Sequence, residues 1–464
     1  MTRLNSTRPT SIDLTSNDPA TVDAFAQALG HDLGGRLLLP GDDGFDAAAT
    51  PWNLAVRQPV AAVVEAADAD DVAATVRHAA AAGLTVAAQS TGHGASGDVA
   101  GTVLLRTRTL DAVEVDAARR TARVGAGASW GAVQAAAAPH GLTTLLGSAP
   151  GVGAVGYTLG GGLGWFSRVH GLAADHVRSF DVVTPAGEQV TVTAASDPEL
   201  FWALRGGGGD LAVVTAMEID LEPVPAFSGG KVAWPAERAA ELLAVFREVT
   251  AAAPPELSVW LSRIEAPGAP AVAVVHAAFL GEATEARALL APFAAVPDAL
   301  GPGVDAAIGP VALAAVGDIT ADPTDPAAGK GRSELLRGID DEAVERLFTT
   351  SVAPLLVLQL RHLGGALAAP GDGAGALGAI AEPYLLYAFG LAFEPGLSTA
   401  VGHRLEALPA ELARVATLRK PATFLAPGES AAAAYGDAAL ARLRDLKRAR
   451  DPRRTIRGNY PLLG

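Results

Sequence analysis

The 464-residue sequence contains no cysteine, and this absence excludes several kinds of functional site. Without thiols the chain forms no disulfide, has no cysteine nucleophile and cannot build a cysteine-ligated zinc site. The nine histidines show no HExxH or comparable metal-ligating spacing. A thiol-dependent enzyme is therefore excluded, and no metal site is predicted.

Charged residues and long apolar runs are also scarce. Only 18% of residues are charged, and the excess of acidic over basic residues gives a net charge of -15. An acidic chain without a basic run argues against nucleic acid or an anionic membrane as a partner. No uncharged apolar run reaches the roughly 18 residues of a membrane-spanning helix, and residues 1–20 lack the apolar core of a signal peptide. We therefore expect a cytoplasmic protein without a membrane or nucleic-acid partner.

Apolar residues make up half of the chain, and the length favours two or three domains. Residues 59–126 alternate between extended segments and a helix at about 69–83, closed by Gly83. A hairpin is predicted over 177–194, and a capped helix and a strand follow before Pro223 and Pro225. This first part spans residues 1–225.

A different pattern begins after residue 225. Long apolar strands alternate with helices over 226–421, which indicates an α+β domain with an antiparallel sheet. Residues 317–334 are rich in glycine, proline and aspartate, and we expect a mobile loop there. Residues 422–464 then form a third segment that contains a helix, a turn and an extended end.

Two glycine motifs need separate interpretation. "GVGAVG" at 151–156 matches a dinucleotide fingerprint, but we expect neither a strand before it nor a helix after it, so we reject that interpretation. The glycines instead let the backbone approach other backbone or a flat ligand. "GASWG" at 127–131 places Ser129 as the nucleophile of a serine hydrolase or, as we prefer, as a helix N-cap.

"QSTGHGASG" at 89–97 sets a single histidine, His93, between two glycines. Such a loop leaves backbone amides free, and its serine and threonine hydroxyls add further donors. A nest of donors suits a pyrophosphate group. The His93 imidazole beside it is placed to attach to the cofactor itself.

These segments, in this order, resemble the vanillyl-alcohol oxidase superfamily, and within it the berberine bridge enzyme-like flavoproteins. The resemblance rests on the His93 loop, the glycine run 151–164, "LFWALRGGGGDLAVVTAMEIDL" and the terminal "RDPRRTIRGNYPL". It implies a two-domain PCMH-type FAD-binding fold: an FAD domain over 1–225, a substrate domain over 226–421 with an antiparallel sheet covered by helices, and a return to the FAD domain over 422–464.

The resemblance also implies how FAD is held. His93 aligns with the histidine that carries the flavin, whereas Ala149 stands where many members have a second attachment through cysteine. The attachment should therefore be single. Gln89 stands where many relatives have arginine. The residues expected to contact FAD are Ser90, Thr91, Gly92, His93, Gly94, Ala95, Pro150, Val152, Gly153, Gly156, Tyr157, Gly161, Leu163, Val214 and Asn459.

The activity implied by the resemblance is oxidation of a small-molecule substrate. A substrate C–H bond, in an alcohol, an amine or a similar compound, gives hydride to flavin N5. Oxygen then reoxidises the flavin and yields hydrogen peroxide. Val152 occupies the position that controls oxygen access in the family, with a residue typical of oxidases. Oxygenase chemistry, flavin binding without turnover and the Ser129 hydrolase remain alternatives.

The substrate domain supplies three candidate catalytic residues. In the strand around 354–362, leucines share one face, and Gln359 and Arg361 share the other. We expect Arg361 to line a wet cavity over the flavin. Tyr384 is preferred over Tyr387 as the base, because its strand face carries small residues that leave room for a substrate; both tyrosines fit equally well as core aromatics. Tyr435 is expected to pack.

Overall fold

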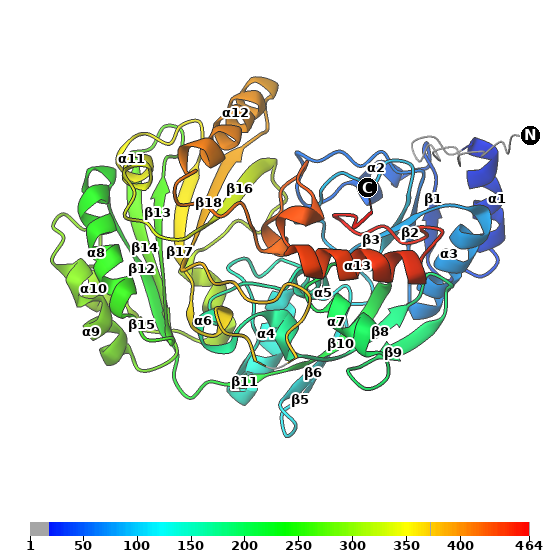
Figure 1. Cartoon of the computed structure of the whole chain (residues 1–464), viewed down its shortest axis with the longest axis horizontal. Coiled ribbons are helices and arrows are strands. Elements are labelled where there is room, and N and C mark those ends of the chain that lie inside the picture. The colour runs from blue at the N-terminus through cyan, green and yellow to red at the C-terminus, as the bar shows by residue number, and fades with distance from the viewer. Residues whose placement is uncertain (1–17, 372, 464) are drawn as a thin grey trace, which may run out of the picture.

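The computed structural model describes residues 18–371 and 373–463. Most of the N-terminal segment in which we expect no signal peptide lies outside these residues. Within the described residues, no helix has both the length and the apolar character needed to span a bilayer. The chain forms three main sheets, and two of them are built only from residues 36–220 (Figure 1).

The first sheet has four strands in the order β1-β2-β4-β3: β1 (Arg36–Leu38), β2 (Ala62–Glu65), β4 (Val103–Arg106) and β3 (Val86–Gln89). β2 and β3 both pair in parallel with β4, and helix α3 (Ala69–Ala82) provides the crossover between β2 and β3. The Asp68 side chain accepts the amides of Asp70 and Asp71 at the start of α3, and Gly83 ends it in a left-handed conformation. The predicted helix is confirmed.

The second sheet is antiparallel, with five strands in the order β5-β6-β10-β8-β9. Its strands are β5 (Val113–Asp116), β6 (Thr121–Gly125), β10 (Val213–Asp220), β8 (Val177–Val183) and β9 (Gln189–Val192). α7 (Pro198–Leu204) precedes β10 and has Asp197 as its N-cap. α4 (Trp130–Ala137) begins at Ser129, whose hydroxyl accepts the amide of Ala132. Ser129 is thus the helix cap that we preferred.

The glycine run corrects one expectation. A short helix, α5 (Ala154–Leu159), begins inside "GVGAVG", although we expected none. It ends where Gly161 and Gly162 adopt positive φ angles that other residues rarely reach. The nearest preceding strand, β7 (Leu142–Thr143), does not lead directly into Gly151, so the rejection of the dinucleotide fingerprint stands on that ground alone.

The third sheet has seven antiparallel strands in the order β15-β12-β14-β13-β17-β18-β16. These are β15 (Gly309–Pro310), β12 (Ser228–Pro235), β14 (Val272–Phe279), β13 (Leu257–Ile264), β17 (Val357–His362), β18 (Tyr384–Leu391) and β16 (Gly329–Leu336). β16 begins inside the region 317–334 that was predicted as a loop. The loop therefore ends before Gly329 and is shorter than predicted. β16 is an edge strand, and edge strands tolerate the polar residues that had suggested a loop.

Helices cover one face of this sheet: α8 (Ala239–Ala252), α9 (Ala283–Ala294), α11 (Glu342–Thr349) and α12 (Pro395–Glu411) (Figure 1). Leu358 and Leu360 of β17 lie in the core beneath them. Because side chains alternate along a strand, Gln359 and Arg361 point to the opposite face. That face is turned toward the first two sheets.

The C-terminal segment returns to the first part of the molecule, where α13 (Asp437–Arg450) packs near α7 (Figure 1). Lys447 is buried and donates to the Asp451 carboxylate at 2.8 Å and to the Ile456 carbonyl. Asp210, also buried, accepts the amides of Gly458 and Leu462. This charge network fixes the last residues of the chain against the strand-and-loop region before β10.

Candidate functional site

The His93 loop, residues 90–97, connects β3 to β4 and is held in a tight conformation. Gly92 has φ +78°, and a Cβ at this position would lie 2.7 Å from Pro51. The Asn459 side chain donates to the Gly94 carbonyl at 2.5 Å and accepts the Ser96 amide at 2.9 Å. Asn459 therefore joins the C-terminal tail to this loop, so both segments contribute to the same site.

The His93 imidazole is the most distinctive group of the site. Its ring stacks on Trp52 with centroids 3.9 Å apart and planes 18° apart. Its Nε2 is buried and has no hydrogen-bond partner among the described residues. Burial lowers the pKa of His93 to about 4, although the charge of Asp322 opposes this shift. At neutral pH the ring is therefore uncharged and one of its nitrogens is unused.

The second glycine loop lies directly beside His93. A Cβ at Gly151 would lie 3.5 Å from His93 Nε2, and one at Gly153 would lie 3.3 Å from Ser90 Oγ. The Val152 carbonyl accepts the Trp130 amide at 2.9 Å, which ties this loop to the start of α4. The structure therefore brings together the predicted residues of both loops: Ser90, Thr91, Gly92, His93, Gly94, Ala95, Pro150, Val152 and Gly153.

The other predicted contacts are in different settings. Gly156 is exposed, and a Cβ there would meet nothing within 4 Å. The Tyr157 hydroxyl is buried without a described partner, and burial raises its pKa. Gly161 packs against Leu377, whereas Leu163 and Val214 lie in the main core. The structure thus gives Leu163 and Val214 a packing role.

Arg361 faces these loops from the seven-stranded sheet, and the wet cavity that we expected around it stays a prediction. It is 8% exposed, and its guanidinium carbon lies 4.0 Å from the centroid of the Trp260 ring. Trp260 stacks in turn on Trp165 of the first part, with centroids 3.5 Å apart. The rings of Tyr387 and Phe424 lie 5.6 and 5.2 Å from the guanidinium carbon. A delocalised guanidinium tolerates such burial because it stacks on aromatic faces and is weakly hydrated.

Gln359 orients the Arg361 side chain. Its Oε1 accepts Arg361 Nε at 2.7 Å, and its Nε2 donates to Ser262 Oγ at 2.9 Å. Both Nη groups of Arg361 are without hydrogen bonds to the described residues. The expectation that Gln359 and Arg361 share one face is confirmed by the register, in which Gln359 opposes Tyr387 and Arg361 opposes Leu385.

The same register corrects the choice of tyrosine. Tyr384 opposes His362, on the face that the helices cover, and its hydroxyl lies 2.8 Å from Thr250 Oγ1 of α8. The small residues on this face do not make room for a substrate. At Gly390, a Cβ would lie 2.7 Å from Val401 of α12, so the helix occupies the space that a side chain would need. Tyr387 is the tyrosine that shares a face with Arg361.

Comparison with known proteins adds to this geometry. Residues 60–193 match the FAD binding domain family. (R)-6-hydroxynicotine oxidase of Paenarthrobacter nicotinovorans is 35% identical over 193 residues, which cover 41% of this chain and 42% of that protein. An FAD-dependent monooxygenase of Fusarium proliferatum is 38% identical over 179 residues, or 38% of this chain and 34% of its own length. The matches therefore span less than half of these relatives.

Solved structures match almost the whole chain. BBE-like 1 of Physcomitrella patens has a TM-score of 0.84 at 21% identity and covers 94% of this chain and 98% of its own. 6-Hydroxy-D-nicotine oxidase from Arthrobacter nicotinovorans has a TM-score of 0.79 at 24% identity, with 93% and 98% covered. Residues 60–193 therefore match an FAD binding domain, and the whole chain has the fold of these two solved structures. That fold combines helices with antiparallel sheets.

The residues present fit FAD, the cofactor of the domain family that residues 60–193 match. His93 offers an unused, uncharged nitrogen, and the loop beside it offers backbone amides. Gly151 and Gly153 lie so close to the His93 loop that larger side chains would fill the space between them. The site therefore combines a group for attachment with two closely apposed loops that contain glycine.

Arg106 is a buried residue of this region that the sequence did not reveal. It lies at the end of β4 and donates to the Ala48 carbonyl at 2.7 Å, to the Thr50 carbonyl and to Gln89 Oε1. Burial lowers its pKa to about 10. Gln89 thus accepts a hydrogen bond from a buried cation. A charged residue at the end of the apolar segment 103–106 is the signal that could have identified it.

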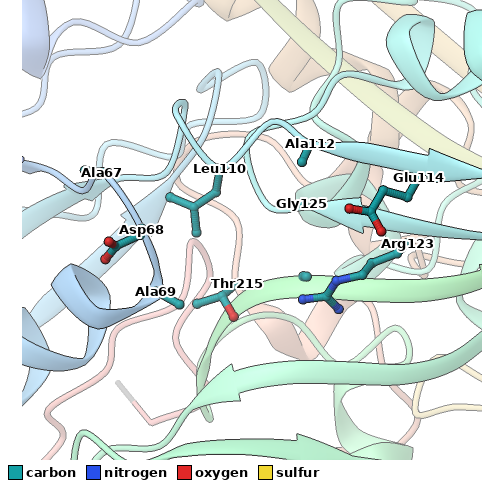
Figure 2. Close-up of a pocket in the computed structure, with 10 residues that line it drawn as sticks. Ala67, Asp68, Ala69, Leu110, Ala112, Glu114, Arg123, Gly125 and Thr215 are labelled. Carbon is teal, nitrogen blue, oxygen red and sulfur yellow. The ribbon is translucent and has the colours of Figure 1, made fainter.

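A separate cavity of about 260 Å³ lies away from this site. Figure 2 shows it between the start of α3 and strands β5, β6 and β10, with Asp68, Leu110, Glu114 and Arg123 around it. Neither His93 nor Arg361 lines it. Glu114 and Arg123 lie opposite each other on the neighbouring strands β5 and β6. Arg123 forms an ion pair with Asp181 of β8. Because this cavity contains none of the residues that fit FAD, we place the candidate functional site in the region between His93 and Arg361.

Proposed function

We propose that this protein is an oxidase that carries FAD on a single covalent bond to His93. The observation that supports this proposal most directly is the buried, unpartnered Nε2 of a neutral imidazole that faces a glycine loop. The chain has no cysteine, so no second attachment of the type found in many relatives is available.

FAD supplies the redox chemistry: it accepts hydride from a substrate carbon and returns the electrons to oxygen, which leaves as hydrogen peroxide. The residues of this chain hold and orient the reactants. The His93 loop and the loop 150–153 bind the cofactor, and Val152 leaves space for oxygen. Arg361, fixed by Gln359, presents free N–H donors to the substrate. Burial raises the pKa of Tyr387 to about 12 despite the nearby charge of Arg361, so its hydroxyl stays protonated and is available as a hydrogen-bond donor to the substrate.

The attachment is tested on the purified protein by acid precipitation and intact-mass measurement. The wild type should stay yellow in the precipitate and carry the mass of one FAD. His93→Ala should release its FAD, whereas His403→Ala, at an exposed position on α12, should retain it. A wild type without the added mass would refute the covalent bond.

The oxidase reaction is tested by screening alcohols, amines and sugars for peroxide release. One peroxide formed per substrate oxidised is expected. Oxygenase chemistry is the second candidate, because one relative with 38% identity is a monooxygenase. Labelled oxygen appearing in the product, with peroxide below one equivalent, would favour that reaction. Failure of every compound to bleach the flavin would favour a flavin-binding protein without turnover.

A further inference from the structure

The segment from Leu313 to Ala328, here called the strap, joins the substrate sheet to the flavin region. On the sheet side, the Ile319 carbonyl lies 3.1 Å from His276 Nδ1. On the other side, a Cβ at Gly317 would lie 3.1 Å from Pro150. Further along, the Thr324 carbonyl accepts the indole N–H of Trp52 at 3.2 Å. The strap therefore crosses from Pro150 to the tryptophan that covers His93.

Asp322 lies midway between these contacts. The residue before it, Ala321, has φ +54°, which a residue with a side chain rarely adopts. Asp322 is half-buried and has no hydrogen bond or ion pair to a described residue. The strained turn thus places an unpaired carboxylate at the centre of the strap, where nothing in the protein's own packing accounts for it.

The groups near this carboxylate come from both parts of the molecule. They are His93 of the flavin region and His276, Arg361 and Tyr387 of the sheet face. Lys231 is a further cation beside His276. Burial lowers the pKa of Arg361, and the charge of Asp322 opposes that shift. The carboxylate therefore lies on the side of the site that carries His93 and Arg361.

An unpaired carboxylate and a guanidinium with unused donors are costly unless a ligand or water satisfies them. We propose that Asp322 contacts the substrate and takes the proton of its hydroxyl or amine as the neighbouring C–H bond is oxidised. The proposal rests on the proposed function.

Hydride, with two electrons, leaves the substrate carbon for FAD, the O–H or N–H proton moves to the Asp322 carboxylate, and C=O or C=N forms. The substrate class is an alcohol or amine that also carries a hydrogen-bond acceptor for Arg361.

The reaction test compares the FAD-loaded wild type with Asp322→Asn and with Asp325→Asn, an exposed carboxylate on the same strap. The substrate is the panel compound that bleaches the wild-type flavin fastest without oxygen. Asp322→Asn should lower the rate constant of bleaching by about 100-fold, the usual effect of losing a general base. Asp325→Asn should stay within about twofold of the wild type, because an exposed surface charge contributes little. Equal rates in all three proteins would overturn the proposal.

A binding test needs neither substrate nor turnover. Sodium formate is titrated while tryptophan fluorescence is followed, because Trp260 stacks on Arg361. Removal of a facing negative charge should tighten formate binding by about tenfold in Asp322→Asn. Unchanged affinity would show that the carboxylate does not face Arg361. If Asp322→Asn binds formate more tightly but its flavin bleaches at the wild-type rate, Asp322 is only a counter-ion of Arg361. That result would overturn its role in proton transfer.

The two tests also separate this inference from the proposed function. If the wild type bleaches with no compound in the panel, the oxidase function fails, and proton transfer by Asp322 fails with it. If the wild type bleaches and Asp322→Asn bleaches equally fast, only the inference fails. Covalent FAD content is measured in all three proteins and should be equal, so that a damaged strap is recognised before rates are compared.

Discussion

Trp52 should control the pH range in which FAD becomes attached to His93. Its indole lies over the imidazole at 3.9 Å and is held in place by the Thr324 carbonyl. Burial of this kind lowers the pKa of His93 to about 4. Trp52→Ala removes the cover and admits water, so the pKa should rise toward the ordinary value of 6.5.

The size of the effect follows from the two pKa values. A lowered pKa favours the neutral imidazole, and only that form has a nitrogen lone pair for bonding to carbon. At pH 5.5 a pKa of about 4 leaves roughly 3% of the ring protonated, whereas a pKa of about 6.5 leaves roughly 90% protonated. The neutral fraction of His93 therefore falls about tenfold in Trp52→Ala at pH 5.5. At pH 8 both proteins are neutral at this position and should differ little.

The assay adds FAD to apoprotein from riboflavin-starved cells and follows acid-stable flavin fluorescence over time. The ratio of the attachment rates at pH 8 and pH 5.5 should be near one for the wild type and about ten for Trp52→Ala. Trp52→Phe keeps a stacked ring and should behave like the wild type. If Trp52→Ala shows the wild-type ratio, burial by Trp52 is not what keeps His93 neutral.

Three other substitutions test separate parts of the site. Val152→Leu should slow reoxidation of the reduced flavin by oxygen and spare its reduction; stopped-flow rates that match the wild type in both steps would refute a role in oxygen access. Tyr384→Phe removes the hydrogen bond to Thr250, so it should lower the free energy of unfolding in urea by about 1 kcal/mol. Its flavin reduction rate should be unchanged, and a large decrease would restore Tyr384 as the base. Gln89→Arg sets a second cation against buried Arg106 and should destabilise the fold by about 3 kcal/mol, whereas Gln89→Glu should be better tolerated; equal melting temperatures for the two variants would contradict the electrostatic argument.

Several features of the fold could be predicted from local sequence signals. Asp68 and Gly83 mark the ends of α3 because a carboxylate satisfies free amides and glycine adopts the left-handed turn without strain. Ser129 caps α4 for the same reason. The alternation in "PLLVLQLRH" correctly separated Leu358 and Leu360 from Gln359 and Arg361. In each case the cause lies within a few residues of the effect.

The choice between the two tyrosines could not be made in this way. Alternation shows that Tyr384 and Tyr387 point to opposite faces, but it does not show which face a helix covers. The contact between Gly390 and Val401 joins β18 to α12 and settles the question only once both are folded. Arg106, Trp52 and Asp322 were missed for a related reason, because the groups that surround them come from distant segments of the chain.

The sequence by itself determined that an FAD-binding fold is expected: the His93 loop and the glycine run, in their order, resemble segments of the vanillyl-alcohol oxidase superfamily, and residues 60–193 match an FAD binding domain. Backbone amides and glycines bind a dinucleotide cofactor through local conformation, so short segments carry that information. Only the tertiary structure decided what surrounds the imidazole and the guanidinium. The stack of Trp165, Trp260 and Arg361 and the strap across His93 combine residues from distant segments, and burial, pKa and the chemistry of a site depend on such packing rather than on neighbours in the chain.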